Sequence, residues 1–233
     1  MYTMSQSFAF ISALITVAIV LGWIIRLPLS RRDKLVPLVG GVLILLVSGA
    51  VGASGMVEDF SEFPPPMMGV LLSVLVLSCG AALSPWGGRL ALAASYRELI
   101  GLQSFRFLPE ILLDLAWRDG VAPIQMTYHG RNFDIITAVT ALAIFLLWSK
   151  LRSERSWAIF HSVIGIGLLL NILAVAVLSM PTPLRIFEND PANTFVTQFP
   201  YIWLPAIHVF AAILLHGLTL RKLAMARNQR NQL

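Results

Sequence analysis

The sequence predicts an all-α polytopic membrane protein, a single domain over residues 1–233 with seven transmembrane helices. Of the 233 residues, 57% are hydrophobic and only 12% are charged, and the mean hydropathy is +0.78. Because soluble domains carry roughly 25% charged residues, this composition argues against a soluble, disordered or secreted disulfide-bonded protein. The single cysteine, Cys79, leaves no internal disulfide and no cysteine-based zinc site.

Seven apolar runs account for most of the chain, and each approaches the length of about 20 residues that crosses a bilayer. The expected spans are residues 7–25, 35–55, 66–86, 99–117, 133–149, 157–180 and 200–220. Six of these runs are predominantly apolar, whereas the fourth contains Arg106, Glu110 and Asp114. The first run has no basic residue before it and no small-residue cleavage site after it, so we expect an uncleaved helix.

The basic residues predict the orientation of these spans, because lysine and arginine accumulate in cytoplasmic connections. Thirteen of the 17 lie in the connections on one side, three lie on the other side, and Arg106 lies within a span. The sequence therefore predicts the N-terminus outside and the C-terminus inside. If residues 99–117 did not cross, the later basic clusters would fall on the wrong side, so the asymmetry also predicts that this run spans. The thirteen residues are Arg26, Arg31, Arg32, Lys34, Arg89, Arg97, Lys150, Arg152, Arg155, Arg221, Lys222, Arg227 and Arg230.

A stripe of charged residues marks the fourth span. Arg106, Glu110, Asp114 and Arg118 follow one another at intervals of four, which places them on one face of a helix, and Gln103 extends that face. An ionised side chain in mid-membrane costs at least about 2.5–3.5 kcal/mol unless it is paired or hydrated. We therefore expect the stripe to face the bundle interior, with Arg106 paired to Glu110.

Further polar residues lie within other spans and in the two outer connections. His208 falls near mid-membrane, where we expect it to meet Glu110 or Asn171. Asn132 and Asp134 are expected to cap the fifth span. The nineteen residues 181–199 are long for an unstructured connection, and Asp190 followed by Pro191 predicts a short lid helix there. The outer-connection candidates for a binding site are His129, Arg131, Asn132, Asp134, Glu188 and Asn193.

The sequence predicts no cofactor and no metal. His161 and His216 lie at similar depth on the last two spans, and two such histidines could ligate a haem; this is kept as the alternative. The three lysines lie at or beyond span ends, so none is placed to hold retinal. The sequence has no phosphate-binding loop, nucleophile elbow or metalloprotease motif.

Several segments resemble a family of small bacterial seven-helix inner-membrane proteins of unknown activity. The similarity extends from the second span onward, and the resemblance implies a bacterial inner-membrane protein without implying an activity. The segments are Phe63–Pro66, Gln103–Arg106, Met126–Ile135, Glu188–Thr194 and Phe199–Pro205, together with the turn around His216.

The predicted function is the binding or translocation of a small polar or ionic solute at a site on the fourth span. The site candidates within the membrane are Gln103, Arg106, Glu110, Asp114, Asn171 and His208. Two alternatives stay open: a membrane enzyme with an outer-leaflet site, which the sequence favours less, and an accessory subunit without a ligand. The bilayer is the expected partner, nucleic acid is not, and the sequence indicates no oligomeric state.

Overall fold

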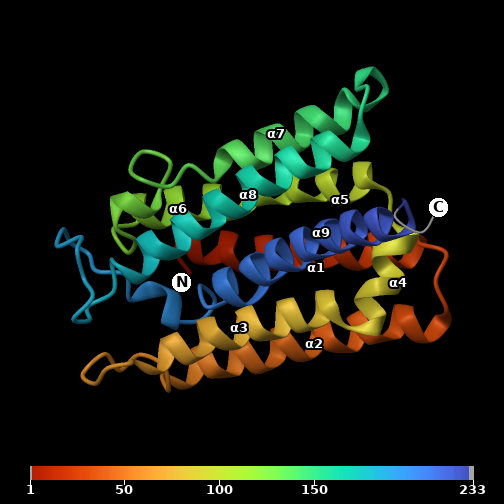
Figure 1. Cartoon of the computed structure of the whole chain (residues 1–233). Helices are drawn as coiled ribbons and strands as arrows, with labels where there is room; N and C mark the ends of the chain where they lie inside the picture. The colour runs from red at the N-terminus through yellow and green to blue at the C-terminus, as the bar shows by residue number, and fades with distance from the viewer. Residues whose placement is uncertain (1, 231–233) are drawn as a thin grey trace.

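The computed structural model describes residues 2–230, and within them the chain forms a bundle of helices without a strand (Figure 1). Five helical segments are long and apolar enough to cross a membrane by length and composition, which supports a helical membrane protein. They are α1 (Met4–Arg26), α2 (Arg31–Ser54), α3 (Pro66–Leu83), α8 (Glu154–Val177), and the continuous segment made of the π-helix η5 (Leu204–Val209) and α9 (Phe210–Arg230).

Local capping chemistry fixes where these helices begin and end. The Thr3 hydroxyl accepts a hydrogen bond from the Gln6 backbone, and the Gln6 side chain accepts one from the Thr3 backbone, which forms a capping box at the start of α1. Ser30 caps α2 through the backbone N–H of Asp33. Gly55 ends α2 in the left-handed conformation at φ 73°, which glycine adopts without steric cost.

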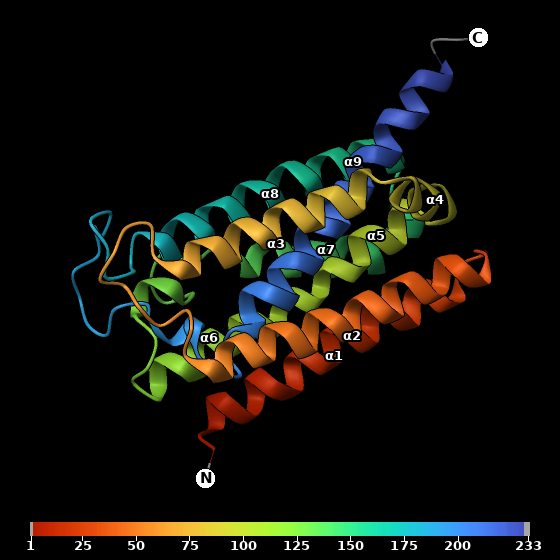
Figure 2. The same ribbon diagram turned by 90° about the horizontal axis from the view of Figure 1, so that it is seen from below.

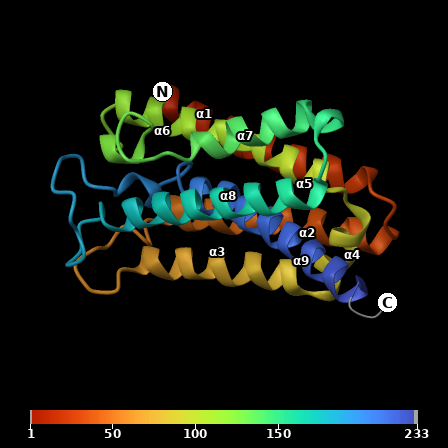
Figure 3. The same cartoon turned by 45° about the horizontal axis from the view of Figure 1, so that its top comes forward.

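The expected span at residues 99–117 is three consecutive elements instead of one helix. These are α5 (Tyr96–Leu102), the 3₁₀ turn η1 (Gln103–Arg106) and α6 (Phe107–Arg118). Pro109 has no N–H to donate to the carbonyl of Phe105, so the α-helical pattern cannot continue through this point. In Figures 2 and 3 the three elements nevertheless run in line along the bundle.

Other helices also begin or end at residues that differ from those of the expected spans. The third span ends at Leu83, because Ser84 and Pro85 start the separate short helix α4 (Pro85–Ala93). Helix α7 (Ile135–Leu146) is shorter than the expected residues 133–149. The lid helix predicted from Asp190 and Pro191 is wrong, because residues 181–199 contain only the 3₁₀ turn η4 (Phe195–Thr197). The remaining turns are η2 (Ile124–Met126) and η3 (Trp148–Lys150).

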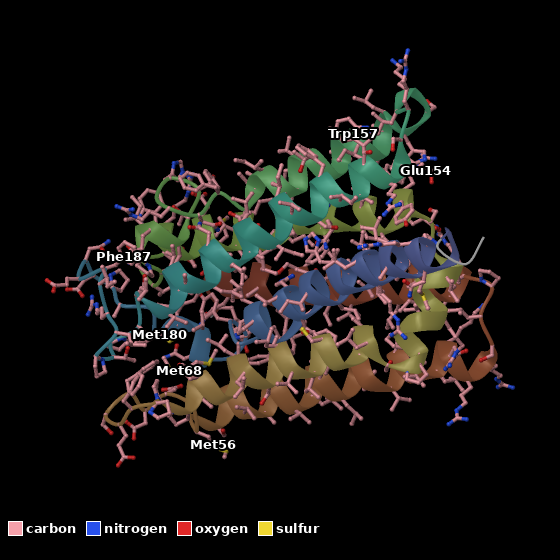
Figure 4. The ribbon with its side chains drawn as sticks, viewed as in Figure 1. Met56, Met68, Glu154, Trp157, Met180 and Phe187 are labelled. Atoms are coloured by element: carbon pink, nitrogen blue, oxygen red, sulfur yellow. The ribbon has the colours of Figure 1, made fainter. Side chains whose placement is uncertain are left out.

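Successive connections lie at opposite ends of the bundle (Figure 1). The connections α1–α2, α3–α5 and α7–α8 and the C-terminal end of α9 gather at one end, which we call the basic end because the thirteen basic residues belong to it. The N-terminus and the connections α2–α3, α6–α7 and α8–η5 gather at the opposite end. Figure 4 marks the basic end by Glu154 and Trp157, and the opposite end by Met56, Met68 and Phe187.

Helix α9 forms the centre of the bundle, and α2 lies at its edge. Ala212, Leu215 and Leu218 of α9 belong to the largest apolar core, where they pack with residues of α1, α4 and α5. Helix α2 is the least buried of the five long segments, with 6% of its apolar stretch buried against 22–44% for the others.

Candidate functional site

The buried guanidinium of Arg106 pairs with Asp134. Arg106 Nε donates to Asp134 Oδ2 at 2.7 Å, Nη2 donates to Oδ1, and the two side chains are 1% and 5% exposed. The prediction that Arg106 pairs with Glu110 is wrong. The junction between η1 and α6 lies between Arg106 and Glu110, so the i,i+4 geometry of a regular helix does not continue through the pair.

Glu110 is held instead by the side chain of Asn132. Asn132 Nδ2 donates to Glu110 Oε1 and Oε2 at 2.9 and 2.8 Å, and Asn132 Oδ1 accepts from the backbone N–H of Asp134 at 3.0 Å. Asp134 occupies the N-cap position of α7, but its side chain makes no capping bond. Its Oδ1 accepts a hydrogen bond from the Thr137 hydroxyl at 3.2 Å, so the carboxylate accepts hydrogen bonds from both Arg106 and Thr137.

Two histidines complete this arrangement on the side of Arg106 that faces α8 and α9. Arg106 Nη1 donates to the carbonyl of Gly165 at 3.2 Å and lies 3.3 Å from His216 Nε2. The rings of His216 and His161 stack with centroids 5.7 Å apart. A Cβ at Gly165 would lie 2.5 Å from His216 Cε1, so only glycine leaves room for the imidazole. We call the six residues the buried polar cluster: Arg106, Glu110, Asn132, Asp134, His161 and His216.

The two histidines are engaged with protein groups. His161 Nε2 lies 3.4 Å from the carbonyl of Thr137, and His216 Nε2 faces Arg106. Axial haem ligation would require one nitrogen of each ring to face a shared iron. Within the described residues no three histidine, cysteine, aspartate or glutamate side chains gather as they would around a metal ion. That the protein binds no cofactor stays a prediction.

His208 and Gln103 lie outside the buried polar cluster. His208 contacts α1, with Nδ1 3.0 Å from Thr16 Oγ1 and Nε2 3.3 Å from Ser12 Oγ, so the expected contact with Glu110 or Asn171 is wrong. Gln103 Nε2 donates to the carbonyl of Ala212 at 3.2 Å, and its buried Oε1 has no hydrogen-bond partner among the described residues.

Asp114 lies near the surface at the opposite end. Arg118 Nε donates to Asp114 Oδ2 at 2.7 Å, and His129 Nε2 lies 3.2 Å from Asp114 Oδ1. The Asp114 side chain is 9% exposed, whereas the side chains of His129 and Arg118 are 45% and 61% exposed. The His129 ring also packs against Trp117. Asp114 therefore stands between the solvent-accessible His129 and Glu110, which is one helical turn farther in.

The remaining candidates tie the outer connections to α8. Asn171 Nδ2 donates to the backbone carbonyl of Arg131 at 2.8 Å, and the Arg131 guanidinium lies over the ring of Phe187 at 5.4 Å. Asn193 Nδ2 donates to the carbonyl of Ala176 at 2.9 Å. The backbone carbonyl of Glu188 accepts a hydrogen bond from Arg185 Nη2, whereas the Glu188 carboxylate makes no hydrogen bond with the described residues. These contacts support an anchoring role for the connections.

Two residues that contact the buried polar cluster, Thr137 and Gly165, were not among the sequence candidates, and His161 and His216 were considered there as haem ligands. Thr137 follows Asp134 at the i,i+3 spacing that brings helical side chains together, which is a signal that could have pointed to it. Gly165 offers no such signal, because its close contact with His216 depends on how α8 and α9 pack.

The comparisons with known proteins identify a family without an assigned activity. A family model described as a domain of unknown function (DUF8737) matches residues 65–224. Neither a curated protein nor a solved structure matches the chain. The matched region contains the whole buried polar cluster and covers more than half of the 233 residues. The chain therefore belongs to this family of unknown function.

Proposed function

We propose that the protein crosses the bacterial inner membrane seven times, with the N-terminus outside and the C-terminus in the cytoplasm. The crossing segments are α1, α2, α3, the run from α5 to α6, α7, α8 and the run from η5 to α9. The grouping of alternate connections at the two ends of the bundle supports this arrangement (Figure 1). The 13-to-3 distribution of basic residues supports the orientation, since the basic end then faces the cytoplasm.

Within this arrangement, the buried polar cluster binds or translocates a small ionic solute, and the charge balance favours a proton or a monovalent cation. The cluster contains two carboxylates, Glu110 and Asp134, but only one guanidinium, that of Arg106, which pairs with Asp134, and all three side chains are buried. With the histidines counted as neutral, the ionised cluster carries one uncompensated negative charge. In low dielectric such a charge is costly, and one bound proton or cation removes it. This charge excess is the observation that carries the proposal.

A row of polar groups extends from the cluster toward both ends of the bundle. From the opposite end, the row begins at the half-exposed His129, continues to Asp114, and reaches Glu110 one turn later. On the other side of Arg106 it continues through His216 to His161. His161 lies seven residues into α8, which places it about 10 Å from the start of that helix at the basic end. Acidic and histidine side chains inside membranes commonly form such proton relays.

The second candidate function is that of an accessory subunit, in which the cluster binds no ligand and only stabilises the packing of the helices. The observation that favours it is the completeness of the hydrogen bonding, because Arg106 bonds both oxygens of Asp134 and the carbonyl of Gly165, while Asn132 bonds both oxygens of Glu110. Arginine–carboxylate networks of this kind can fix a helix without binding a ligand.

The two candidates differ in cation flux across a reconstituted membrane. Purified protein is placed in vesicles, and proton, sodium and potassium movement is followed with ion-sensitive dyes under an imposed gradient. The proposal expects flux of one of these ions above that of protein-free vesicles, and its loss in Glu110→Gln. Glu62→Gln, an exposed carboxylate in the α2–α3 connection, serves as the matched control and keeps the flux. Absence of flux of all three ions with folded protein contradicts the proposal and favours the accessory subunit.

A further inference from the structure

Helix α2 contacts the rest of the bundle closely at two places that lie far apart along its axis. At the basic end, Arg89 Nε and Nη2 donate to the Asp33 carboxylate at 3.0 and 2.6 Å, and Trp86 Nε1 donates to the Asp33 carbonyl at 2.9 Å. Toward the opposite end, Gly49 and Gly52 lie against the segment before η5. At 1.5 Å per residue, Asp33 and Gly49 are about 24 Å apart.

A groove of about 280 Å³ separates α2 from the bundle between these two contacts. Its wall on α2 includes Pro37, Gly40, Gly41 and Ile44, which share one helix face, and α1 and α9 supply aliphatic and aromatic side chains such as Phe210. A Cβ at Gly40 would meet no atom within 4 Å, and one at Gly41 would meet only Val17 at 3.9 Å. The two glycines therefore leave open space where larger residues would fill the groove.

The end of the groove nearest Val36 adjoins the basic first turn of α2. Arg31 and Arg32 are exposed and form no hydrogen bond or ion pair with the described residues, whereas the neighbouring Asp33 is engaged by Arg89. Lys34 Nζ donates to the carbonyl of Ile25. Arg32 precedes Val36 by one helical turn on the same side of α2, so its unpaired guanidinium borders the end of the groove. An apolar groove that ends beside a guanidinium complements a molecule with a hydrocarbon chain and an anionic head.

We propose that this groove binds one acyl chain of an anionic glycerophospholipid, with the lipid phosphate against Arg32. Van der Waals contact of the methylene groups with Val17, Ile44 and Phe210 supplies the affinity, since a lipid chain is already in apolar surroundings. Bidentate arginine–phosphate contacts supply the preference for an anionic head. The bound chain fills the space that the separation of α2 leaves, so it holds the central part of α2 against α1 and α9. This inference does not depend on the proposed ion binding.

Retention of added lipid by the purified, delipidated protein tests the proposal. The probes are phosphatidylglycerol and phosphatidylcholine with identical chains, and bound lipid is counted by native mass spectrometry. The wild type is expected to retain phosphatidylglycerol preferentially. Gly40→Leu, whose Cβ meets no atom within 4 Å and whose side chain occupies space in the groove, should weaken retention by about tenfold, equivalent to about 1.4 kcal/mol. Gly69→Leu on α3, also without a neighbour within 4 Å of its Cβ, is the matched control and should retain lipid as the wild type does.

A second variant distinguishes the contribution of the lipid headgroup from that of the acyl chain. Arg32→Gln should abolish the preference for phosphatidylglycerol over phosphatidylcholine while some binding of both persists. Equal retention by Gly40→Leu and the wild type would overturn the proposal, as would equal retention of the two lipids by the wild type. If Gly40→Leu changed the oligomeric state and not the lipid retention, a second copy of the chain would be the occupant and the proposal would be wrong.

Discussion

Arg106 and Asp134 form a buried ion pair between elements that are 28 residues apart in the chain. The pair joins the η1 turn, which separates α5 from α6, to the N-cap residue of α7. Removing one partner of a buried pair leaves an uncompensated charge and costs about 3–5 kcal/mol, whereas replacing both by apolar residues can be nearly neutral. The pair therefore couples the position of α7 to that of η1.

A double-mutant cycle on this pair should show strong coupling. We expect Arg106→Met and Asp134→Leu each to lower thermal stability in detergent, and the double variant to recover much of the loss. Residues in direct contact couple by about 0.5–3 kcal/mol. The pair of the exposed Arg118 with Asp114 is the control, for which we expect at most about 1 kcal/mol because Arg118 is open to solvent. Independent, additive effects of Arg106→Met and Asp134→Leu would show that the two side chains do not pair.

Gly165 and Gly167 provide a matched test of the packing around His216. Both lie in α8, but a Cβ at Gly165 would lie 2.6 Å from His216 Nε2, whereas one at Gly167 meets nothing within 4 Å. We expect Gly165→Ala to cost about 1–3 kcal/mol through overpacking. Gly167→Ala should be neutral or stabilising by up to about 1 kcal/mol, because alanine favours a helix more than glycine does. Thermal unfolding of the two variants checks this, and equal stability would contradict the contact.

Asp119 should contribute a pH-dependent part of the stability at the opposite end. Hydrogen bonds from the Ser5 side chain and then the Ser5 backbone lower the pKa of this carboxyl. A carboxyl with a lowered folded-state pKa stabilises the fold above its unfolded pKa, about 3.9, and loses that contribution as the pH falls through the folded value. Asp119→Asn should therefore lower the melting temperature at about pH 7, and the difference from wild type should narrow below about pH 4. A difference that is constant over this range would contradict the contact.

Reporter fusions test the proposed orientation. The 13-to-3 distribution of basic residues predicts that a reporter fused to the C-terminus is cytoplasmic and that one inserted in residues 182–194 is periplasmic. The expected result is activity of alkaline phosphatase only at the second position. Phosphatase activity at the C-terminus would show that the chain crosses the membrane an even number of times, so that one of the proposed crossings does not span.

Composition and periodicity predict the long helices well, because burial in an apolar solvent requires long apolar runs. The expected residues 7–25 and 157–180 lie close to α1 and α8. The break at η1 was harder to predict, although Pro109 was visible, because a proline in an apolar run can kink a helix or interrupt it. The short helix α4 was missed because the expected third span, residues 66–86, included Ser84 and Pro85, which in the structure start a new helix.

The members of the site were easier to predict than their partners. Intramembrane charge singled out Arg106 and Glu110, since such residues are costly unless they are satisfied. Sequence spacing reveals only neighbours along one helix, so it favoured Glu110 over the more distant Asp134. Asp134 has an ordinary explanation as a helix cap, which concealed its role as the partner of Arg106. Contacts such as that between His208 and Thr16 depend on helix packing and carry no sequence signal.

Ion flux through vesicles that contain the Arg106→Met/Asp134→Leu double variant tests most directly whether the buried polar cluster is functional. This variant replaces a buried pair by apolar residues, so it should fold with a melting temperature near that of the wild type. It removes one positive and one negative charge, so the uncompensated charge on Glu110 remains, but it interrupts the row of polar groups at Arg106, between Glu110 and His216. We predict that the folded double variant shows no more cation flux than protein-free vesicles, while the wild type in parallel vesicles conducts. Flux equal to that of the wild type would contradict the account, because the cluster would then serve only to seat the helices.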